Sequence, residues 1–177
     1  WSYCYYRDQA FVLGWGMSVE EVFMHSLAKA EDASSGGRQI PHHWGHKATR
    51  MVSKSSCTGV QFLQGTGTAM GALKSGTDEV VYVSAGEGTT SEGEFFEALN
   101  WASRDKLPVI FHIQDNKYAI SVHISEQTAG GSVYKLAAGF ENLAREQVDG
   151  IDFFETHRAF KSAVKRAREG KGPTIIV

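Results

Sequence analysis

Residues 79–122 constrain the fold more than any other stretch of this chain, because they predict a strand, a helix and a second strand in succession. The first strand, residues 80–84, is rich in β-branched and aromatic side chains. Ser91 followed by Glu94 is the pattern of a capping box, which predicts that a helix begins there. A second apolar strand follows at residues 109–113. Strand–helix–strand units of this kind build parallel sheets.

Polar residues follow both predicted strands. Glu87 lies between Gly86 and Gly88 after the first strand, and Asn116 lies just beyond the second. The carboxyl ends of parallel strands meet at one edge of a sheet, where ligands bind. Carboxylate and amide oxygens suit Mg²⁺, and glycines at a helix N-terminus let backbone N–H groups approach an anion. The pattern therefore predicts Mg²⁺ together with a phosphorylated ligand.

The alternation of predicted elements indicates an α/β fold with a doubly wound, mainly parallel sheet and helices on both faces. We expect a single domain over residues 1–177. The first helix should begin with a capping box of Ser18 and Glu21. The expected elements outside the central unit are helices at 18–30, 59–74, 133–140 and 153–169, a short strand ending near Val148, and a strand at 174–177. The apolar residues expected to be buried on the first and last helices are Val22, Phe23, Leu27, Phe153, Phe154, Ala159, Phe160 and Val164.

Composition excludes several classes of function. Lysine plus arginine is 18 and aspartate plus glutamate is 20, giving a net charge of −2, which argues against general nucleic-acid binding. No apolar run approaches the ~20 residues that a membrane span requires. Two cysteines, Cys4 and Cys57, give no disulfide framework, and both are expected to be small packed residues. Trp1 lies close before a motif and Val177 closes a strand, so we expect a fragment or a chain without its flanking segments.

Three histidines, His42, His43 and His46, raise the question of a zinc site. Pro41 and Gly45 make a regular helix improbable there, so the spacing does not place the histidines on one helical face. No cysteine pair accompanies them, and the pattern does not favour zinc.

The segments GEGTTSEGEFFEALNWA and DNKYAIS resemble the alpha subunit of the decarboxylating component of 2-oxo acid dehydrogenase complexes, closest to the branched-chain type. The spacing from Gly86-Glu87-Gly88 to Asn116 is similar to the thiamine diphosphate motif. The resemblance implies the thiamine diphosphate-binding fold, with thiamine diphosphate and Mg²⁺ as cofactors. It implies that Mg²⁺ is held by Glu87, the side-chain oxygen of Asn116 and the carbonyl of Tyr118.

The resemblance also assigns a set of cofactor-binding positions, and it makes His43 a candidate near the active-site entrance. The set is Tyr6, Arg7, Ser56, Thr58, Gly86, Glu87, Gly88, Thr89, Asn116, Tyr118 and Ala119. The chain departs from the family pattern at four positions. These are Cys57 in place of Pro, Thr58 in place of a large aliphatic residue, Gln114 in place of a phosphate-binding Arg, and Asp115 in place of Asn.

The implied reaction is oxidative decarboxylation of a branched-chain 2-oxo acid or pyruvate, with acyl transfer to the lipoyl group of an acyltransferase core. A beta-type subunit or domain would supply the glutamate that activates the cofactor, so the chain alone should be inactive. We expect this partner to contact the small-residue helix 59–74 through an exposed apolar patch. The location would be the cytoplasm of a bacterium or the mitochondrial matrix. Two alternatives remain: another thiamine diphosphate enzyme, such as an acetoin dehydrogenase or transketolase-like protein, and a non-catalytic cofactor-binding domain.

Overall fold

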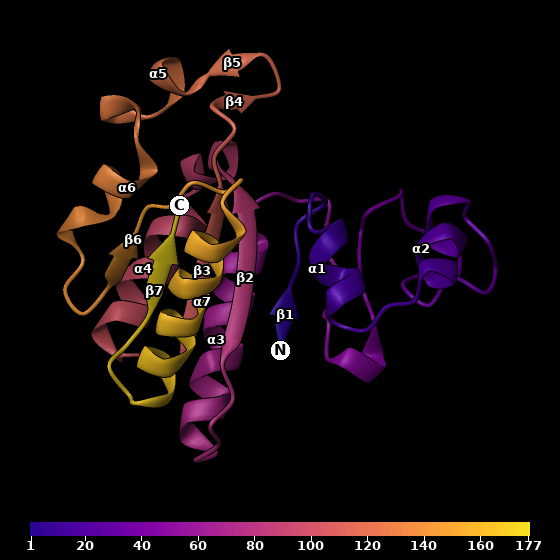
Figure 1. Cartoon of the computed structure of the whole chain (residues 1–177), viewed down its shortest axis with the longest axis horizontal. Coiled ribbons are helices and arrows are strands. Elements are labelled where there is room, and N and C mark those ends of the chain that lie inside the picture. The colour runs from indigo at the N-terminus through magenta and orange to yellow at the C-terminus, as the bar shows by residue number, and fades with distance from the viewer.

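A five-stranded parallel sheet forms the centre of the computed structural model, which describes all residues, 1–177 (Figure 1). Its strand order is β1-β2-β3-β7-β6. The strands are β1 (Ser2–Tyr3), β2 (Val81–Gly86), β3 (Val109–Gln114), β6 (Ala144–Glu146) and β7 (Thr174–Ile176). A separate antiparallel hairpin, β4 (Tyr118–Ala119) with β5 (Val122–His123), projects beyond the carboxyl ends of the sheet strands. The predicted parallel sheet is confirmed.

Helices cover both faces of the sheet, as expected. The long helices are α3 (Val60–Lys74), α4 (Gly93–Arg104) and α7 (Phe153–Arg168). The shorter ones are α1 (Gln9–Gly14), α2 (Val19–Ser26), α5 (Ile124–Gln127), α6 (Val133–Leu136), and the 3₁₀ turns η1 (Lys47–Thr49), η2 (Glu87–Ser91), η3 (Ala129–Gly131) and η4 (Ala137–Gly139). None of these helices combines the length and the apolar character needed to cross a membrane.

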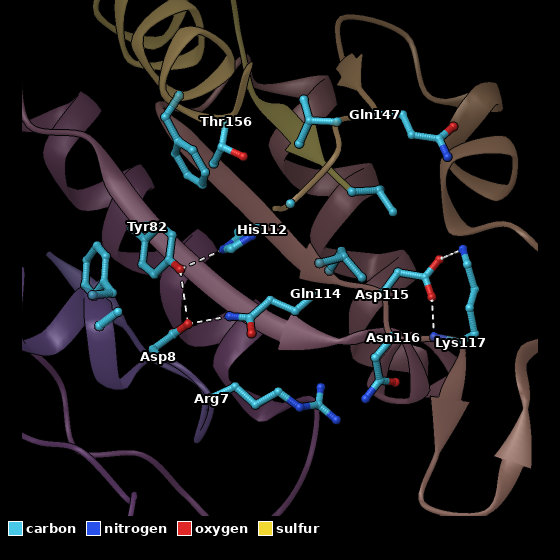
Figure 2. A pocket seen from close by; sticks show the side chains of 17 residues that line it. Arg7, Asp8, Tyr82, His112, Gln114, Asp115, Asn116, Lys117, Gln147 and Thr156 are labelled. Atoms are coloured by element: carbon cyan, nitrogen blue, oxygen red, sulfur yellow. Dashed lines mark hydrogen bonds and ion pairs between the residues drawn. The ribbon is translucent and has the colours of Figure 1, made fainter. Parts of the chain in front are cut away.

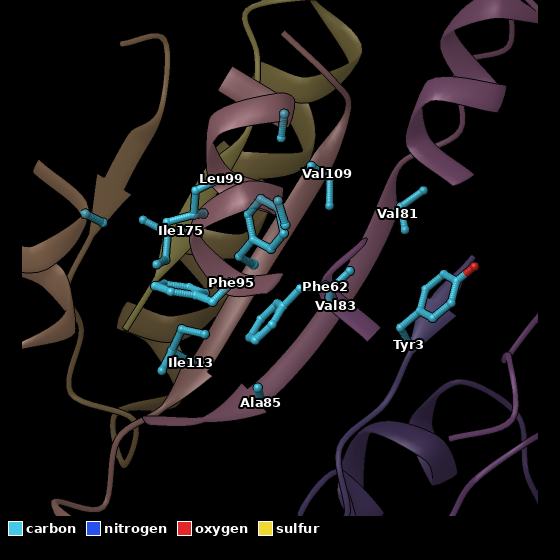
Figure 3. Close-up of a cluster of buried hydrophobic side chains, with 14 of the residues drawn as sticks. Tyr3, Phe62, Val81, Val83, Ala85, Phe95, Leu99, Val109, Ile113 and Ile175 are labelled. Atoms are coloured by element: carbon cyan, nitrogen blue, oxygen red, sulfur yellow. The ribbon is translucent and has the colours of Figure 1, made fainter. Parts of the chain in front are cut away.

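Alternating side chains of the strands fill two separate layers. Val83 of β2 and Phe111 of β3 pack with Phe62 of α3 and Phe95 of α4 in the main core (Figure 3). The next residue of β3, Ile110, points to the other face, where the inward side of α7 covers it. Both faces of these strands are therefore buried, which is the usual state of a parallel sheet.

The two predicted capping boxes have different outcomes. The Ser18–Glu21 box is present, with the Glu21 N–H donating to Ser18 Oγ at 3.1 Å and the Ser18 N–H donating to Glu21 Oε2 at 2.8 Å. The Ser91–Glu94 box is wrong, because α4 begins at Gly93 and Ser91 ends the 3₁₀ turn η2. The Ser91 hydroxyl instead accepts a hydrogen bond from the Gln127 side chain at 2.9 Å. The donor to the Ser91 hydroxyl is therefore a side chain 36 positions later in the chain, and not the backbone N–H of a helical first turn.

The predicted buried faces of α2 and α7 are partly wrong. On α2, Val22 is buried, but Phe23 and Leu27 are more than 60% exposed. The helix ends at Ser26, soon before Ala28 adopts a left-handed φ of 51°, so it cannot extend its apolar stripe. On α7 the buried residues are Ala159, Ala163 and Ala167, and small side chains let the helix lie close to the sheet. The aromatic pair at its first turn, Phe153 and Phe154, is exposed.

The N-terminal residues form structure that the sequence did not predict. Ser2 and Tyr3 pair with Tyr82 and Val83 as the edge strand β1. Cys4 is buried there as predicted, whereas Cys57 is exposed and the expectation that it packs is wrong. The early strand directs the following residues, including Arg7, toward the carboxyl edge of the sheet.

Candidate functional site

Glu87 and Asn116 leave adjacent strands at the same edge of the sheet. Strands β2 and β3 are parallel neighbours, and their last residues, Gly86 and Gln114, are register partners. Glu87 follows the first of these directly, and Asn116 lies two residues beyond the second. The prediction that both arrive at one sheet edge is confirmed, because parallel pairing sends both chain ends in the same direction.

Glu87 is almost fully buried, with 1% of its surface exposed, and neither of its carboxylate oxygens has a hydrogen-bond partner. A buried polar group without a partner is costly, and a carboxylate more so than a neutral group. A cation in contact with these oxygens would remove that cost. Glu87 therefore fits the role of a metal ligand, with oxygen chemistry that suits Mg²⁺.

The segment after β3 is held by short local contacts. The Asn116 side-chain oxygen accepts a hydrogen bond from the Tyr118 N–H at 3.0 Å. The Asp115 carboxylate accepts from the Lys117 N–H at 2.8 Å and forms an ion pair with the Lys117 ammonium. Asp115 is therefore paired within its own turn, which leaves the oxygens of Asn116 and Tyr118 as the neutral donors to a cation there.

Both glycines around Glu87 are required by close packing. A Cβ on Gly86 would lie 2.6 Å from the Tyr5 hydroxyl and 3.3 Å from an Arg7 nitrogen. A Cβ on Gly88 would lie 2.7 Å from the Cβ of Ala119. These distances leave no room for a side chain. The glycines thus bring the N-terminal segment and the β4–β5 hairpin directly against the turn that carries Glu87.

A cavity of about 730 Å³ opens at this edge of the sheet (Figure 2). Two predicted cofactor-binding residues, Arg7 and Asn116, line it. Its other lining residues are Asp8, Ala10, Phe11, Tyr82, His112, Ile113, Gln114, Asp115, Lys117, Gln147, Val148, Gly150, Thr156, Phe160 and Val177. The volume lies within the ~300–1,000 Å³ range of small-molecule sites.

Arg7 is the cation of this cavity that no carboxylate neutralises. Its guanidinium carbon lies 5.2 Å from the ring centre of Tyr5 and 5.1 Å from that of Tyr6, and it forms no ion pair. Lys117, the other cation of the lining, is paired with Asp115. The planar fork of an arginine suits phosphate, so Arg7 could bind an anionic ligand, with the ring of Tyr6 packed beside its guanidinium.

The other nine predicted cofactor-binding residues, Glu87 among them, do not line this cavity. Two of these, Ser56 and Thr58, bond residues outside the lining. The Ser56 hydroxyl is hydrogen-bonded to Nε2 of His43 at 2.7 Å, and the Thr58 hydroxyl donates to Glu92 at 3.5 Å. Thr89 is buried in η2 beside Glu87. The structure thus brings the residues around Glu87 together with Arg7 and Asn116, and places Ser56 and Thr58 on a separate loop.

Asp8 is a site residue that the sequence prediction missed. Its buried carboxylate accepts hydrogen bonds from the Tyr5 N–H at 2.8 Å, from the Ser84 hydroxyl and from the Gln114 side-chain amide. Burial raises the pKa of Asp8, while these hydrogen bonds lower it in part. Asp8 follows Arg7 directly in the sequence, but only the fold shows that its carboxylate bonds residues of β2 and β3.

Tyr82 and His112 form the uncharged floor of the cavity. The Tyr82 hydroxyl lies 2.8 Å from Nδ1 of His112. Burial lowers the pKa of His112 to about 4 and raises the pKa of Tyr82 well above its usual value. Both groups are therefore neutral near pH 7, and neither supplies charge to an anionic ligand.

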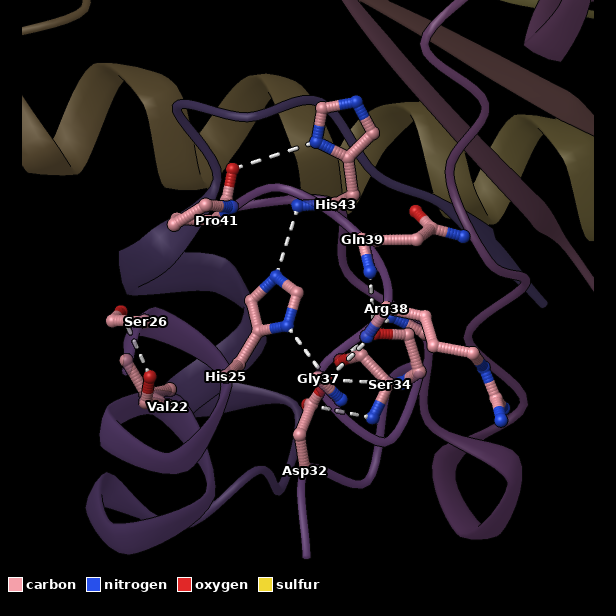
Figure 4. Close-up of polar contacts among 12 residues, drawn as sticks. Val22, His25, Ser26, Asp32, Ser34, Gly37, Arg38, Gln39, Pro41 and His43 are labelled. Atoms are coloured by element: carbon pink, nitrogen blue, oxygen red, sulfur yellow. Dashed lines mark hydrogen bonds and ion pairs between the residues drawn. The ribbon is translucent and has the colours of Figure 1, made fainter. Parts of the chain in front are cut away.

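His43 belongs to a polar cluster in the N-terminal part of the chain (Figure 4). Its backbone N–H donates to Nε2 of His25 at 3.1 Å, and Nδ1 of His25 lies 3.1 Å from the Asp32 carboxylate. Since Nε2 accepts, the ring proton of His25 is on Nδ1 and faces Asp32. Burial, followed by the positive charge of Lys54, lowers the pKa of His43. This cluster orders the loop that carries His43.

The three histidines considered for zinc have different partners. His43 bonds Ser56, His46 bonds Glu21 and Thr49, and the ring of His42 stacks on Trp44. No group of three or more His, Cys, Asp or Glu side chains converges as a metal site.

Several exposed apolar side chains lie near the cavity, whereas α3 exposes few. Helix α3 exposes one large hydrophobic residue, Leu73, so the expected patch on that helix is wrong. A Cβ on Gly67 or Gly71 of α3 would meet open space. The exposed residues near the carboxyl edge are Tyr118, Ile120 and Val122 on the β4–β5 hairpin and Ile151, Phe153 and Phe154 at the start of α7.

An open parallel sheet with a cavity and an unpartnered buried carboxylate at its carboxyl edge is typical of the class of α/β domains that bind ligands there. The family model described as the dehydrogenase E1 component matches residues 1–177. The chain therefore belongs to the dehydrogenase E1 component family.

Relatives with assigned names agree with this membership. The chain is 41% identical over 172 residues to the 2-oxoisovalerate dehydrogenase subunit alpha of Bacillus subtilis, covering 97% of this chain and 52% of that protein. It is 34% identical over 173 residues to the pyruvate dehydrogenase E1 component subunit alpha of Staphylococcus aureus, covering 97% of this chain and 43% of that protein. The chain thus spans about half the length of the curated relatives it matches.

Solved structures share the fold. One is a Mycobacterium smegmatis protein described as a thiamin diphosphate-dependent enzyme, with a TM-score of 0.56 and 25% identity over 71% of this chain and 23% of that one. Another is the transketolase of Campylobacter jejuni, with a TM-score of 0.60 and 21% identity over 73% of this chain and 21% of that one. The second likeness shows the fold alone.

Proposed function

We propose that this chain is the alpha-type part of a 2-oxo acid dehydrogenase and holds the diphosphate and Mg²⁺ end of thiamine diphosphate. The observation that carries the proposal is Glu87, a buried carboxylate without a partner at the carboxyl edge of the sheet. Asn116 leaves the neighbouring strand at the same edge, and Arg7 stands beside Gly86. A dication held by this carboxylate would offset part of the negative charge of a diphosphate, and Arg7 would offset more of it.

The residues divide into two roles. Glu87, the side-chain oxygen of Asn116 and the carbonyl of Tyr118 would hold Mg²⁺, which prefers oxygen ligands. Arg7 and Tyr6 would face the diphosphate, while Gly86, Gly88, Thr89 and Ala119 shape the backbone around it, and Ser56 and Thr58 lie on the loop toward the cofactor ring. When bound, thiamine diphosphate supplies the electron sink for decarboxylation of a 2-oxo acid. The protein positions it and excludes water.

The substrate we propose is a branched-chain 2-oxo acid, with pyruvate as the second candidate. The higher identity to the 2-oxoisovalerate dehydrogenase subunit favours the first. The acyl product would pass to a lipoyl group on an acyltransferase core. His43, ordered by His25 and hydrogen-bonded to Ser56, is the candidate for contact with the substrate.

A beta-type subunit or domain would complete the site. Exposed apolar residues on the β4–β5 hairpin and at the start of α7 stand next to the cavity, and Ile120 and Ile151 are almost fully exposed. Apolar surface of this kind at a ligand site is typical of an interface. We infer that the partner covers this edge and supplies the glutamate that activates the cofactor.

Calorimetry with Mg²⁺ and thiamine diphosphate, on the chain together with a beta-type partner, tests cofactor binding. Failure of the folded chains to bind both together refutes the proposal. A turnover assay with an added beta-type chain then compares 2-oxoisovalerate, pyruvate and acetoin. We expect 2-oxoisovalerate to be used best and no turnover without the partner. Turnover of acetoin alone would identify a different thiamine enzyme, and binding without any turnover would identify a non-catalytic domain.

A further inference from the structure

Lys54 is a half-buried cation without a counter-charge. Its backbone N–H donates to the Trp44 carbonyl at 2.9 Å, which fixes the start of its side chain. The ammonium makes one long hydrogen bond, 3.4 Å to the Ser55 carbonyl, and forms no ion pair. It lies 5.8 Å from the ring centre of Tyr6. Most buried lysines are paired, so this position calls for an explanation.

Tyr6 connects Lys54 to the candidate site. The guanidinium of Arg7 lies 5.1 Å from the centre of the same ring, so two unpaired cations share one aromatic side chain. A contact with one aromatic ring does not by itself offset the loss of water of the half-buried Lys54 ammonium. Burial lowers the pKa of Lys54, as this loss of water requires. An anion between the two cations would offset this loss.

The charges at the site show why a second cation is needed. Glu87 and Asp8 are buried carboxylates, and Lys117 is neutralised by Asp115. Arg7 is then the single free cation of the cavity lining. Gln114 directs its amide to Asp8 and adds no charge.

We propose that Lys54 binds an anionic oxygen of the ligand, together with Arg7, at the ring of Tyr6. The proposal rests on the proposed function and adds a residue to its site. The oxygen belongs either to the diphosphate of the cofactor or to the carboxylate of the 2-oxo acid, since both present the same oxyanion chemistry. A lysine suits this role because its ammonium is a point charge on a flexible stem.

The test uses Lys54→Met, which keeps the length of the side chain and removes the charge, with Lys161→Met on the exposed face of α7 as the matched control. Calorimetry with inorganic pyrophosphate and Mg²⁺ tests whether Lys54 binds an oxygen of the diphosphate. The KM for 2-oxoisovalerate tests whether Lys54 binds the carboxylate of the substrate. It is measured with the beta-type chain and saturating thiamine diphosphate.

We expect Lys54→Met either to weaken pyrophosphate binding or to raise the KM for 2-oxoisovalerate by about tenfold, equal to about 1.4 kcal/mol. Lys161→Met should leave both values unchanged. Lys54→Arg should retain most of the wild-type value, and a thermal melt checks that each variant is folded. Wild-type pyrophosphate affinity together with wild-type KM in folded Lys54→Met would overturn the proposal. The two failures are distinguishable. If only the role of Lys54 is wrong, the wild-type chain still binds thiamine diphosphate. If the proposed function is wrong, the wild-type chain does not bind it.

Discussion

The side-chain amide of Gln114 donates a hydrogen bond to the carboxylate of Asp8, a residue 106 positions earlier in the chain. The same carboxylate accepts from the Tyr5 N–H and from the Ser84 hydroxyl. One buried group therefore joins the turn after β1 to the ends of β2 and β3. Because Arg7 lies between Tyr5 and Asp8 in sequence, these bonds also hold the backbone that carries Arg7.

Replacing Asp8 with Asn should loosen this junction. An amide oxygen can accept some of the same bonds, but its NH₂ group cannot accept from Tyr5 or Ser84. We expect the free energy of unfolding to fall by about 2 kcal/mol, as for loss of hydrogen bonds to a charged group. Urea denaturation measures this, and calorimetry should show weaker binding of thiamine diphosphate with Mg²⁺. Asp105→Asn, at the Arg104 ion pair on the surface, is the control, and an equal loss in both variants would contradict the role of Asp8.

Glu87→Gln should separate binding from stability. The Glu87 carboxylate has no hydrogen-bond partner within the chain, so the substitution removes no internal bond and relieves the burial of a charge. We expect the ligand-free chain to be as stable as the wild type or more stable, with Mg²⁺-dependent thiamine diphosphate binding lost. Thermal melts with and without the cofactor give both results. Glu97→Gln on α4 serves as the control, and wild-type affinity in Glu87→Gln would exclude Glu87 as a metal ligand.

Gly88→Ala should be rescued by a change on the facing hairpin. The added Cβ would lie 2.7 Å from the Cβ of Ala119, which is too close for two carbon atoms. We expect a loss of about 1–3 kcal/mol, the usual cost of overpacking. The double variant Gly88→Ala with Ala119→Gly should recover much of it. Gly67→Ala, where a Cβ meets open space in α3, should be neutral or stabilising. A double variant no better than Gly88→Ala alone would show that Ala119 is not the obstacle.

Asp32 should make the chain sensitive to acid. Burial alone would raise its pKa, but hydrogen bonds from His25, Ser34, Ser35 and Gly37 outweigh it and lower the pKa from 3.8 to about 2. The unfolded chain therefore takes up a proton at higher pH than the folded chain. The stability from Asp32 is complete above its unfolded pKa and is lost as pH falls through 3.8 toward 2.

Urea denaturation of the wild type and Asp32→Asn at several pH values measures this contribution. The difference in unfolding free energy between the two should shrink as the pH falls from 5 to 2. A difference that stays constant over this range would show that the Asp32 charge does not stabilise the folded chain.

Local pattern in the sequence determined the two central strands, β2 and β3, and the position of the candidate metal ligands. Residues 80–84 and 109–113 carry enough β-branched and aromatic side chains to specify strands, and parallel pairing then places Glu87 and Asn116 at one edge. The Ser18–Glu21 capping box was equally local, since donor and acceptor lie within one turn. Strands and capping boxes depend on residues that are close together in the chain, so they can be predicted from the sequence.

Tertiary structure decided the contacts made between residues far apart. Ser91 became the acceptor for Gln127 instead of a helix cap, and Asp8 became the anchor for Gln114. Lys54 and Arg7 came to share the ring of Tyr6 although a long loop separates them. A buried polar group bonds whichever partner the fold brings within about 3 Å, and sequence distance does not encode that proximity.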